Sequence, residues 1–266
     1  MTNRIDARFS KLRAAGQKGF IAYITGGDPS LEKTVELALA LENAGVDILE
    51  LGVPFSDPLA DGIVNQMAAQ RALNGGATMA GVLECVREIR KTSELPIVLY
   101  AYMNPLYVYG FQKFHADAEA AGVDGVLILD LTPEEDTEEF QYRGNLKRIR
   151  LIAPTTPEHR IAAIAERAEG FIYYVSREGV TGEQSSVSTN IGERVAAIRK
   201  CTELPIAIGF GVSTPEQAAE VAACGDGVVV GSAIVKRIAE HGLSADAAEK
   251  VAAFVRPLTE AAHKAK

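Results

Sequence analysis

The chain has 266 residues, of which 47% are hydrophobic and 23% are charged, and its formal net charge is −8. This composition suits a globular protein with a sizeable core, and the negative charge disfavours nucleic acid as a partner because phosphate binding needs a basic surface. No apolar run reaches membrane-spanning length and no signal-peptide core opens the chain, so we expect a cytoplasmic protein without a membrane segment. Its cysteines are odd in number and widely spaced, which fits a reducing compartment and argues against disulfides or a zinc site.

Short apolar segments alternate with helical patterns along the whole chain. A short amphipathic helix is expected first, because Ile5, Phe9 and Leu12 have helical spacing. Strands are then predicted at residues 20–25, 48–51, 97–101, 126–129, 149–152, 171–175, 206–209 and 228–230. This alternation is typical of an all-parallel sheet. We therefore predict an α/β fold, a single-domain TIM (β/α)8 barrel over residues 1–266 with an extra N-terminal helix, rather than an open doubly wound sheet.

Several local signals mark where helices begin and where strands follow. Ser30 is expected to cap the next helix, and Thr-Pro pairs at 132–133, 156–157 and 214–215 should each open one. A glycine and an aspartate precede three of the predicted strands, at 45–47, 122–124 and 225–226. The segment 89–97, Ile-Arg-Lys-Thr-Ser-Glu-Leu-Pro-Ile, recurs at 198–206 as Ile-Arg-Lys-Cys-Thr-Glu-Leu-Pro-Ile. Such internal similarity indicates a closed repeating architecture.

Carboxylates are the titratable groups expected at the carboxyl ends of the strands, where the active site of such a barrel lies. They are Glu50, Asp61 and Asp130. Glu50 falls inside an apolar strand, where desolvation should raise its pKa and suit it to give and take protons near neutral pH. The alternative is that Glu50 points to solvent and that Asp57 and Asp61 are ordinary turn and cap residues. None of the four histidines follows a predicted strand, which disfavours a histidine base and a histidine-ligated metal.

The loops after the later strands could form a phosphate-binding site and a loop that closes over the substrate. Gly209-Phe210-Gly211 and Gly231-Ser232 follow the seventh and eighth predicted strands, and glycines and helix N-termini let backbone amides approach an anion. Tight turns without a ligand are the alternative for both loops. The long polar loop 176–188 either closes on substrate or is a plain surface loop. Strand-end tyrosines could line an aromatic pocket with Phe210 or only fill the core: Tyr23, Tyr100, Tyr102 and Tyr173.

The segment 50–62, Glu-Leu-Gly-Val-Pro-Phe-Ser-Asp-Pro-Leu-Ala-Asp-Gly, resembles the signature of the tryptophan synthase alpha subunit family. The resemblance is supported by Ser-Arg-Glu-Gly-Val-Thr-Gly at 176–182 and by both glycine loops, and it spans residues 25–235. It implies a lyase that cleaves indole-3-glycerol phosphate to indole and glyceraldehyde 3-phosphate, with no cofactor of its own. It also implies a partner, a beta subunit that holds pyridoxal phosphate and receives the indole within an alpha2beta2 tetramer.

The resemblance implies roles for individual residues. Glu50 would be the general acid-base that delivers a proton to the indole ring carbon, and Asp61 would hold the indole N–H and stabilise positive charge. Thr181 would close against Asp61, and Tyr173 would flank the glycerol phosphate chain. Further contacts are implied with the phosphate, by Gly182, Phe210, Gly211, Gly231 and Ser232, and with the partner, by Asp57, Pro58, Asn104 and Pro105.

The chain departs from the family pattern at two places. Ile63 stands where a proline usually follows Ala-Asp-Gly, and Asn65 stands where an apolar residue is common. Thr132 separates a leucine and a proline that are usually adjacent. The first departure could alter one wall of the indole pocket, and the second touches an expected interface.

Three other functions are alternatives to this one. A barrel enzyme acting on another phosphosugar would need a lysine or a second base at a strand end, and no lysine stands there. An allosteric activator with a dormant site is disfavoured because Glu50, Asp61 and Thr181 are all present. A free-standing lyase that releases indole without a partner stays open.

Overall fold

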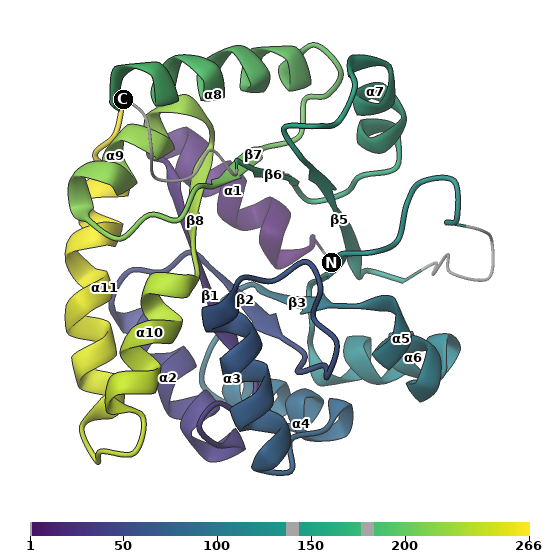
Figure 1. Ribbon diagram of the computed structural model, residues 1–266, viewed down its shortest axis with the longest axis vertical. Coiled ribbons are helices and arrows are strands. Elements are labelled where there is room, and N and C mark those ends of the chain that lie inside the picture. The colour runs from purple at the N-terminus through teal and green to yellow at the C-terminus, as the bar shows by residue number, and fades with distance from the viewer. Residues whose placement is uncertain (1, 137–143, 177–183) are drawn as a thin grey trace.

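A closed barrel of eight parallel strands forms the centre of the computed structural model (Figure 1). The model describes residues 2–136, 144–176 and 184–266, with the backbone alone at 184–190. The strands follow one another around the barrel, and β8 pairs with β1. They are β1 (Gly19–Thr25), β2 (Ile48–Gly52), β3 (Ile97–Ala101), β4 (Gly125–Ile128), β5 (Lys147–Ile152), β6 (Ile172–Val175), β7 (Ile206–Gly209) and β8 (Gly227–Val230). Each predicted strand is confirmed, with its ends displaced by at most two residues.

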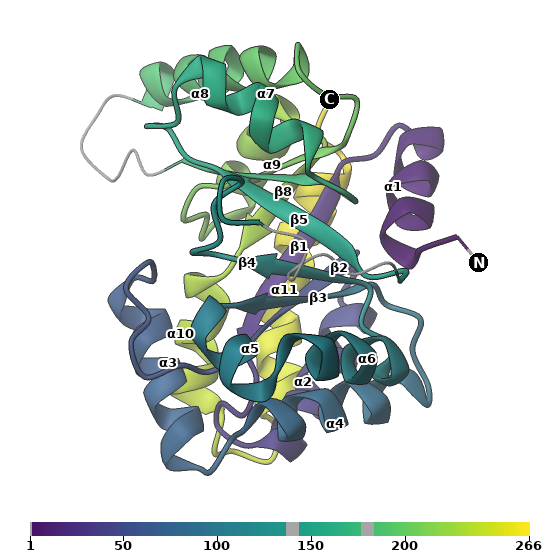
Figure 2. The same ribbon diagram turned by 90° about the vertical axis from the view of Figure 1, so that its right-hand side faces the viewer.

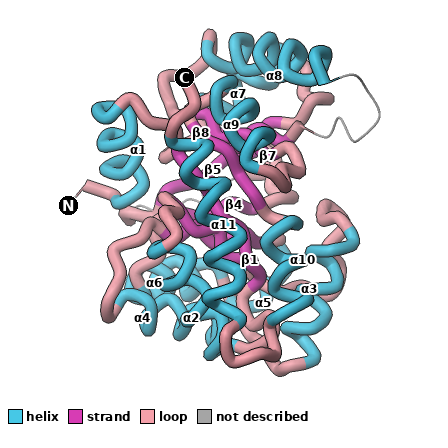
Figure 3. The backbone as a smooth tube through the Cα atoms, turned by 90° about the vertical axis from the view of Figure 1, so that its left-hand side faces the viewer, coloured by secondary structure: helices cyan, strands magenta, loops and turns pink. Residues whose placement is uncertain are grey.

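Helices surround the strands as an outer layer, which Figure 3 shows around the barrel. Those of the described residues are α1 (Arg4–Ala15), α2 (Leu31–Asn43), α3 (Ile63–Asn74), α4 (Met79–Arg90), α5 (Met103–Tyr109), α6 (Phe111–Ala121), α7 (Glu158–Glu166), α8 (Gln184–Arg199), α9 (Pro215–Cys224), α10 (Ser232–His241) and α11 (Ala247–His263). The last helix, α11, packs against both α2 and α9. In the described part of the chain, no helix is both long and apolar enough to pass through a membrane.

The capping predictions are only partly confirmed. Ser30 accepts a hydrogen bond from the Lys33 amide at 3.1 Å, and Thr214 caps α9 with a proline in the first turn. Of the other two Thr-Pro predictions, the one at 132–133 is wrong, whereas 156–157 does open α7 but with a different capping residue. Residues 133–135 form a turn rather than a helix, and Pro157 itself is the N-cap of α7. The hydroxyl of Thr156 instead accepts from the Ala153 amide at 3.0 Å, so it stabilises the preceding turn.

Alternation of side chains along each strand divides the core into two layers. Outward side chains pack under the helices, and inward side chains fill the barrel. The first helix closes one end of this interior, because Ile5, Phe9 and Leu12 pack against inward residues of the strands. Figure 2 shows α1 lying to one side of the strands, apart from the ring of the other helices. The amino ends of the strands are thus covered, and the carboxyl ends remain for the site.

The repeated glycine–aspartate pattern has a structural explanation. Asp47, Asp124 and Asp226 each precede a strand and accept a backbone hydrogen bond, at 2.8 Å, from the start of the strand before it. The recurring segment supplies the cation, because Arg90 binds Asp124 and Arg199 binds Asp226. Each carboxylate therefore fixes the relative position of two neighbouring strands at their amino ends.

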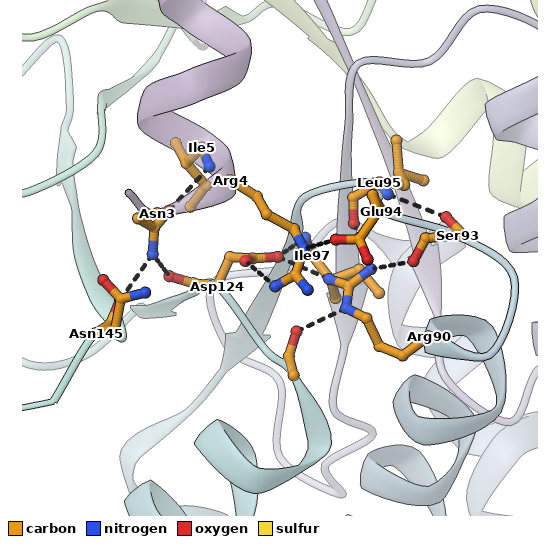
Figure 4. A network of polar contacts seen from close by, with 11 residues as sticks. Asn3, Arg4, Ile5, Arg90, Ser93, Glu94, Leu95, Ile97, Asp124 and Asn145 are labelled. Carbon is orange, nitrogen blue, oxygen red and sulfur yellow. Dashed lines mark hydrogen bonds and ion pairs between the residues drawn. The ribbon is translucent and has the colours of Figure 1, made fainter. Parts of the chain in front are cut away.

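Figure 4 shows the most extensive of these networks, around Asp124. Its Oδ2 accepts from Arg90 at 2.7 Å, and its Oδ1 accepts from Arg4 of α1 at 3.0 Å. The side chain of Asn3 donates to the Asp124 carbonyl at 2.9 Å and also caps α1. Arg90 in turn donates to the Leu95 carbonyl at 2.7 Å. One buried carboxylate thus joins α1, α4, β3 and β4.

Replacing Asp124 by alanine should lower the free energy of unfolding by about 3 kcal/mol, because the Arg90 guanidinium and the Ile97 amide lose a buried partner. Urea unfolding followed by circular dichroism measures this loss. Asp226→Ala is the control, since the Asp226 side chain also binds one arginine and one strand amide but lacks a counterpart of Arg4 and is 29% exposed, against 3% for Asp124. It should cost about half as much. Equal losses in the two variants would contradict the role assigned to burial.

Candidate active site

The carboxyl group of Glu50 lies inside the barrel. Glu50 pairs with Tyr23 of β1 and Val98 of β3, and all three occupy inward positions. Its side chain is completely buried, and neither carboxyl oxygen has a hydrogen-bond partner among the described residues. Burial raises the pKa of Glu50 from 4.5 to about 8. The solvent-facing alternative is therefore excluded, and the predicted direction of the pKa shift is confirmed.

Asp61 is held over the barrel mouth by donors from the neighbouring strand. The hydroxyl of Tyr100 donates to its Oδ1 at 3.0 Å, and that of Tyr102 donates to its Oδ2 at 2.8 Å. Tyr102 also accepts from the Ala60 amide at 3.0 Å, so it binds the loop as well as the carboxylate. The Gln66 side chain donates to the Asp61 carbonyl at 2.8 Å. Both the backbone and the carboxylate of Asp61 are thereby fixed.

Three tyrosines lie between the two acids. Tyr23 and Tyr100 meet edge to face with ring centroids 4.9 Å apart. Burial, followed by the charge of Asp61, raises the pKa of Tyr23 and of Tyr100, whereas burial and then Glu50 raise the pKa of Tyr173. All three hydroxyls therefore stay protonated and can donate. Tyr23 lies opposite Glu50 in the sheet and packs against Tyr100, which binds Asp61, so the two acids belong to one site.

Two glycines make room for these rings at the strand ends. A Cβ on Gly52 would lie 2.4 Å from the Tyr23 hydroxyl, and one on Gly209 would lie 2.7 Å from the Tyr173 hydroxyl. Any other residue at either position would displace a tyrosine from the mouth. Gly209 therefore has a packing role beside the phosphate role expected for its loop.

The expected phosphate loops lie side by side at the ends of β7 and β8. Gly211 has a φ of +70° and is exposed, with no atom within 4 Å of where its Cβ would be. Gly231 is the N-cap of α10, and the exposed Ser232 begins that helix. The free amides at this helix start are a suitable environment for an anion. Phe210 is half-buried and packs against the outer core rather than among the inward tyrosines.

Several other predicted residues have separate places. Asp130 accepts from the Met103 amide at 2.7 Å and so caps α5, which gives this acid a structural role. Asp57 and Pro58 lie on the loop after β2, and Asn104 and Pro105 lie in α5 after the neighbouring β3. Thr181 and Gly182, with most of the expected closing loop, fall outside the described residues. Within the described ranges, no three His, Cys, Asp or Glu side chains are arranged to hold a metal ion.

Sequence reasoning named Tyr100 and Tyr102 as pocket residues but missed that they hold Asp61. The available signal was their spacing of two residues, with Tyr100 on the inward face of β3 and Tyr102 directly after the end of that strand. It also missed that Asn65 donates to Asp61 Oδ1 at 3.4 Å. The tyrosine contacts depend on how the loop after β2 folds back over β3, whereas the Asn65 contact joins residues only four apart at the start of α3.

Comparison with known proteins gives one consistent family. The family model described as tryptophan synthase alpha chain matches residues 9–263. The tryptophan synthase alpha chain of Geobacter sulfurreducens is 48% identical over 97% of this chain and 98% of that protein. The corresponding protein of Opitutus terrae is 52% identical over 90% of this chain and 91% of that protein. Among solved structures, the alpha subunit from Legionella pneumophila has a TM-score of 0.90 at 39% identity and covers 98% of each chain.

The burial of Glu50 predicts a pH-dependent stability. Its folded pKa of about 8 lies above the unfolded value of 4.5, so it destabilises the fold progressively as pH rises from about 4.5 to 8. Glu50→Gln removes this titration. Its melting temperature should equal or slightly exceed that of the parent at pH 5 and exceed it by a growing margin up to pH 8, since each pKa unit corresponds to about 1.4 kcal/mol. Thermal unfolding at a series of pH values measures this, and a difference that does not change with pH would contradict the burial argument.

Proposed function

The chain belongs to the tryptophan synthase alpha chain family, the lyases that act on indole-3-glycerol phosphate, and we propose that Glu50 and Asp61 carry out this reaction here. The observation that carries the assignment is the Glu50 carboxyl group, which is buried, has no hydrogen-bond partner in the described structure and is protonated near neutral pH. Such a group is expensive to maintain in a folded protein unless the reaction uses it.

Glu50 acts first as an acid and then as a base. It delivers its proton to the indole carbon that carries the glycerol chain, which makes the ring cationic. The resulting carboxylate then takes the proton from the hydroxyl group beside that carbon. The hydroxyl becomes the aldehyde of glyceraldehyde 3-phosphate, and the electrons of the broken carbon–carbon bond neutralise the ring. A pKa of about 8 suits both steps, because Glu50 then holds a proton to give near neutral pH and its carboxylate is a stronger base than an ordinary one when it takes a proton back.

Asp61 stabilises the positive charge that appears on the ring between these two steps. Its carboxylate is already oriented by Tyr100 and Tyr102, so little reorganisation is needed when the charge develops. The backbone around Gly211 and the start of α10 binds the phosphate, with Gly231 and Ser232 at that helix start. The tyrosine rings of the mouth, Tyr23, Tyr100 and Tyr173, flank the remainder of the substrate.

The proposed chemistry needs no cofactor in this chain. The protonated indole ring itself accepts the electrons of the broken bond, so neither a metal nor pyridoxal phosphate is required for this half of the reaction. Pyridoxal phosphate belongs to the proposed beta subunit, which would join the released indole to serine. We further propose a cytoplasmic location, which is supported by the three free cysteines.

Indole release from indole-3-glycerol phosphate tests the assignment directly. The purified chain should release indole slowly, and a cognate beta subunit should stimulate release strongly. Glu50→Gln should lower kcat about 10³-fold, because proton transfer is lost, and Asp61→Asn about 10²-fold, because the cationic ring loses its counter-charge. The parent rate should fall above about pH 8, where Glu50 no longer carries a proton. No indole from the parent with or without the partner would refute the function, and fast release without it would indicate a free-standing lyase.

The proposed beta-subunit contact lies on the loop after β2 and on α5. Tyr102 ties the two together through the Ala60 amide and packs its ring 5.5 Å from that of Phe55. Large apolar side chains are exposed on both segments and at the start of α3, and these form the apolar rim: Leu59, Ile63, Tyr107 and Val108. Exposed apolar groups collected beside a catalytic mouth are typical of a protein interface. Asp57, Pro58, Asn104 and Pro105 belong to the same two segments.

Polar substitutions on the apolar rim should separate partner binding from chemistry. The double variant Leu59→Ser, Val108→Ser should bind the beta subunit at least about tenfold more weakly, since both side chains lose apolar burial, and should keep the unstimulated rate. Leu243→Ser is the control, because Leu243 is 96% exposed on the turn between α10 and α11. Titration calorimetry and stimulated indole release measure the effect, and an unchanged affinity of the double variant would remove the apolar rim from the interface.

A further inference from the structure

Asn65 carries a buried polar atom that the fold does not use. Asn65 lies in the first turn of α3, and its Nδ2 donates to Asp61 Oδ1 at 3.4 Å. Its Oδ1 is buried and has no hydrogen-bond partner among the described residues. Inside the barrel mouth it shares this condition with the two carboxyl oxygens of Glu50. Native proteins rarely leave a buried acceptor unpaired, so such an atom calls for a role.

The local structure gives the Asn65 oxygen no other partner among the described residues. The start of α3 has no side-chain cap, so the Asn65 oxygen does not bind the free amides there. The packing face of the helix is supplied by its neighbours, because Val64 and Ala68 lie in the cluster of Tyr23 and Val235. An apolar side chain of equal size would fill the same space without an unpaired oxygen. The amide is therefore retained at a cost to stability.

The hydrogen bond to Asp61 fixes which way the amide points. Were the amide reversed, its oxygen would face the carboxylate oxygen and two acceptors would meet. The NH2 group therefore faces Asp61, and the carbonyl oxygen faces away from it. Asp61 Oδ1 also accepts from Tyr100, an inward residue of β3, so the Asn65 amide lies at the mouth itself. Two acceptors of different charge, the Asp61 carboxylate and the Asn65 amide oxygen, thus belong to side chains that meet at the mouth.

We propose that Asn65 is a positioning residue for the indole ring, whose N–H donates jointly to the Asn65 amide oxygen and to the Asp61 carboxylate. This inference rests on the proposed function and names a contact within that site. The amide oxygen receives the hydrogen bond that it lacks in the free protein. The dipole of the Asn65 amide also faces the ring nitrogen as positive charge develops there. This contact keeps the ring oriented while the ring carbon that carries the glycerol chain receives its proton.

A pair of unreactive analogues isolates the N–H group. The first is indole-3-propanol phosphate, which keeps the ring and the phosphate but lacks the two hydroxyls of the chain. The second is its benzothiophene counterpart, in which sulfur replaces N–H. Dissociation constants come from competition against indole-3-glycerol phosphate cleavage by the complex with the beta subunit. In Asn65→Leu, the preference for the indole analogue over the benzothiophene analogue should fall about tenfold.

Two controls make the outcome specific. Asn74→Leu changes an exposed asparagine of the same helix and should keep the parent preference. The free Asn65→Leu protein should melt at or above the parent temperature, because the unpaired buried oxygen is gone; if leucine disturbs the helix start, Asn65→Ala provides the same comparison.

Equal weakening of both analogues, or no weakening, would overturn the proposal. Weaker binding of the substrate alone would assign the oxygen to a chain hydroxyl instead. Failure of the parent to cleave substrate would refute the proposed function and is a separate result.

Discussion

The carboxyl group of Glu50 lies inside the barrel because β2 is held in one register between β1 and β3. A shift by one residue would turn Leu49 and Leu51 inward and Glu50 outward, and the site would be lost. The register is secured at the amino ends of the strands, where Asp47 binds the Phe20 amide at the start of β1. Asp124 and Asp226 do the same for two other strand pairs. The hydrogen bonds at the amino ends of the strands thus set the geometry of the site at their carboxyl ends.

Packing at the mouth connects the two acids with the phosphate loops. Gly52 and Gly209 each leave the space that a tyrosine hydroxyl occupies. The absence of a side chain at these two strand ends therefore determines where the tyrosine rings lie. Tyr100 then joins the barrel interior to the loop after β2, because its ring packs on Tyr23 and its hydroxyl holds Asp61. The rigid barrel therefore positions Asp61 even though this residue lies on a loop.

The sequence predicted the strands, the closed barrel and the burial of Glu50 because these depend on local apolar patterns and on alternation along a strand. It failed at the Thr-Pro pair of 132–133, where no helix starts, and at 156–157 it placed the start of α7 but not its cap. The hydrogen bond from Tyr102 to Asp61 and the cap that Asp130 gives α5 were also out of reach. Each joins segments about 25 residues or more apart, and only the folded loops bring them together. Glu50 and Asp61 were themselves predicted from their positions near strand ends, whereas their individual roles and the substrate came from the resemblance of residues 50–62 to a family signature.

Polar groups at the two ends of the barrel differ: those at the mouth include unpaired buried oxygens, and those at the other end are hydrogen-bonded. Glu50 and Asn65 both hold buried oxygens that have no partner among the described residues, and each such oxygen lowers the stability of the free protein. The aspartates at the opposite end, by contrast, have their acceptors filled by amides and arginines. A substrate that brings a basic ring carbon, an N–H group and a hydroxyl supplies the missing partners. The hydrogen bonds that these oxygens lack in the folded protein then form when the ligand binds. The stability lost in the empty site therefore favours a ligand that has those groups over one that lacks them.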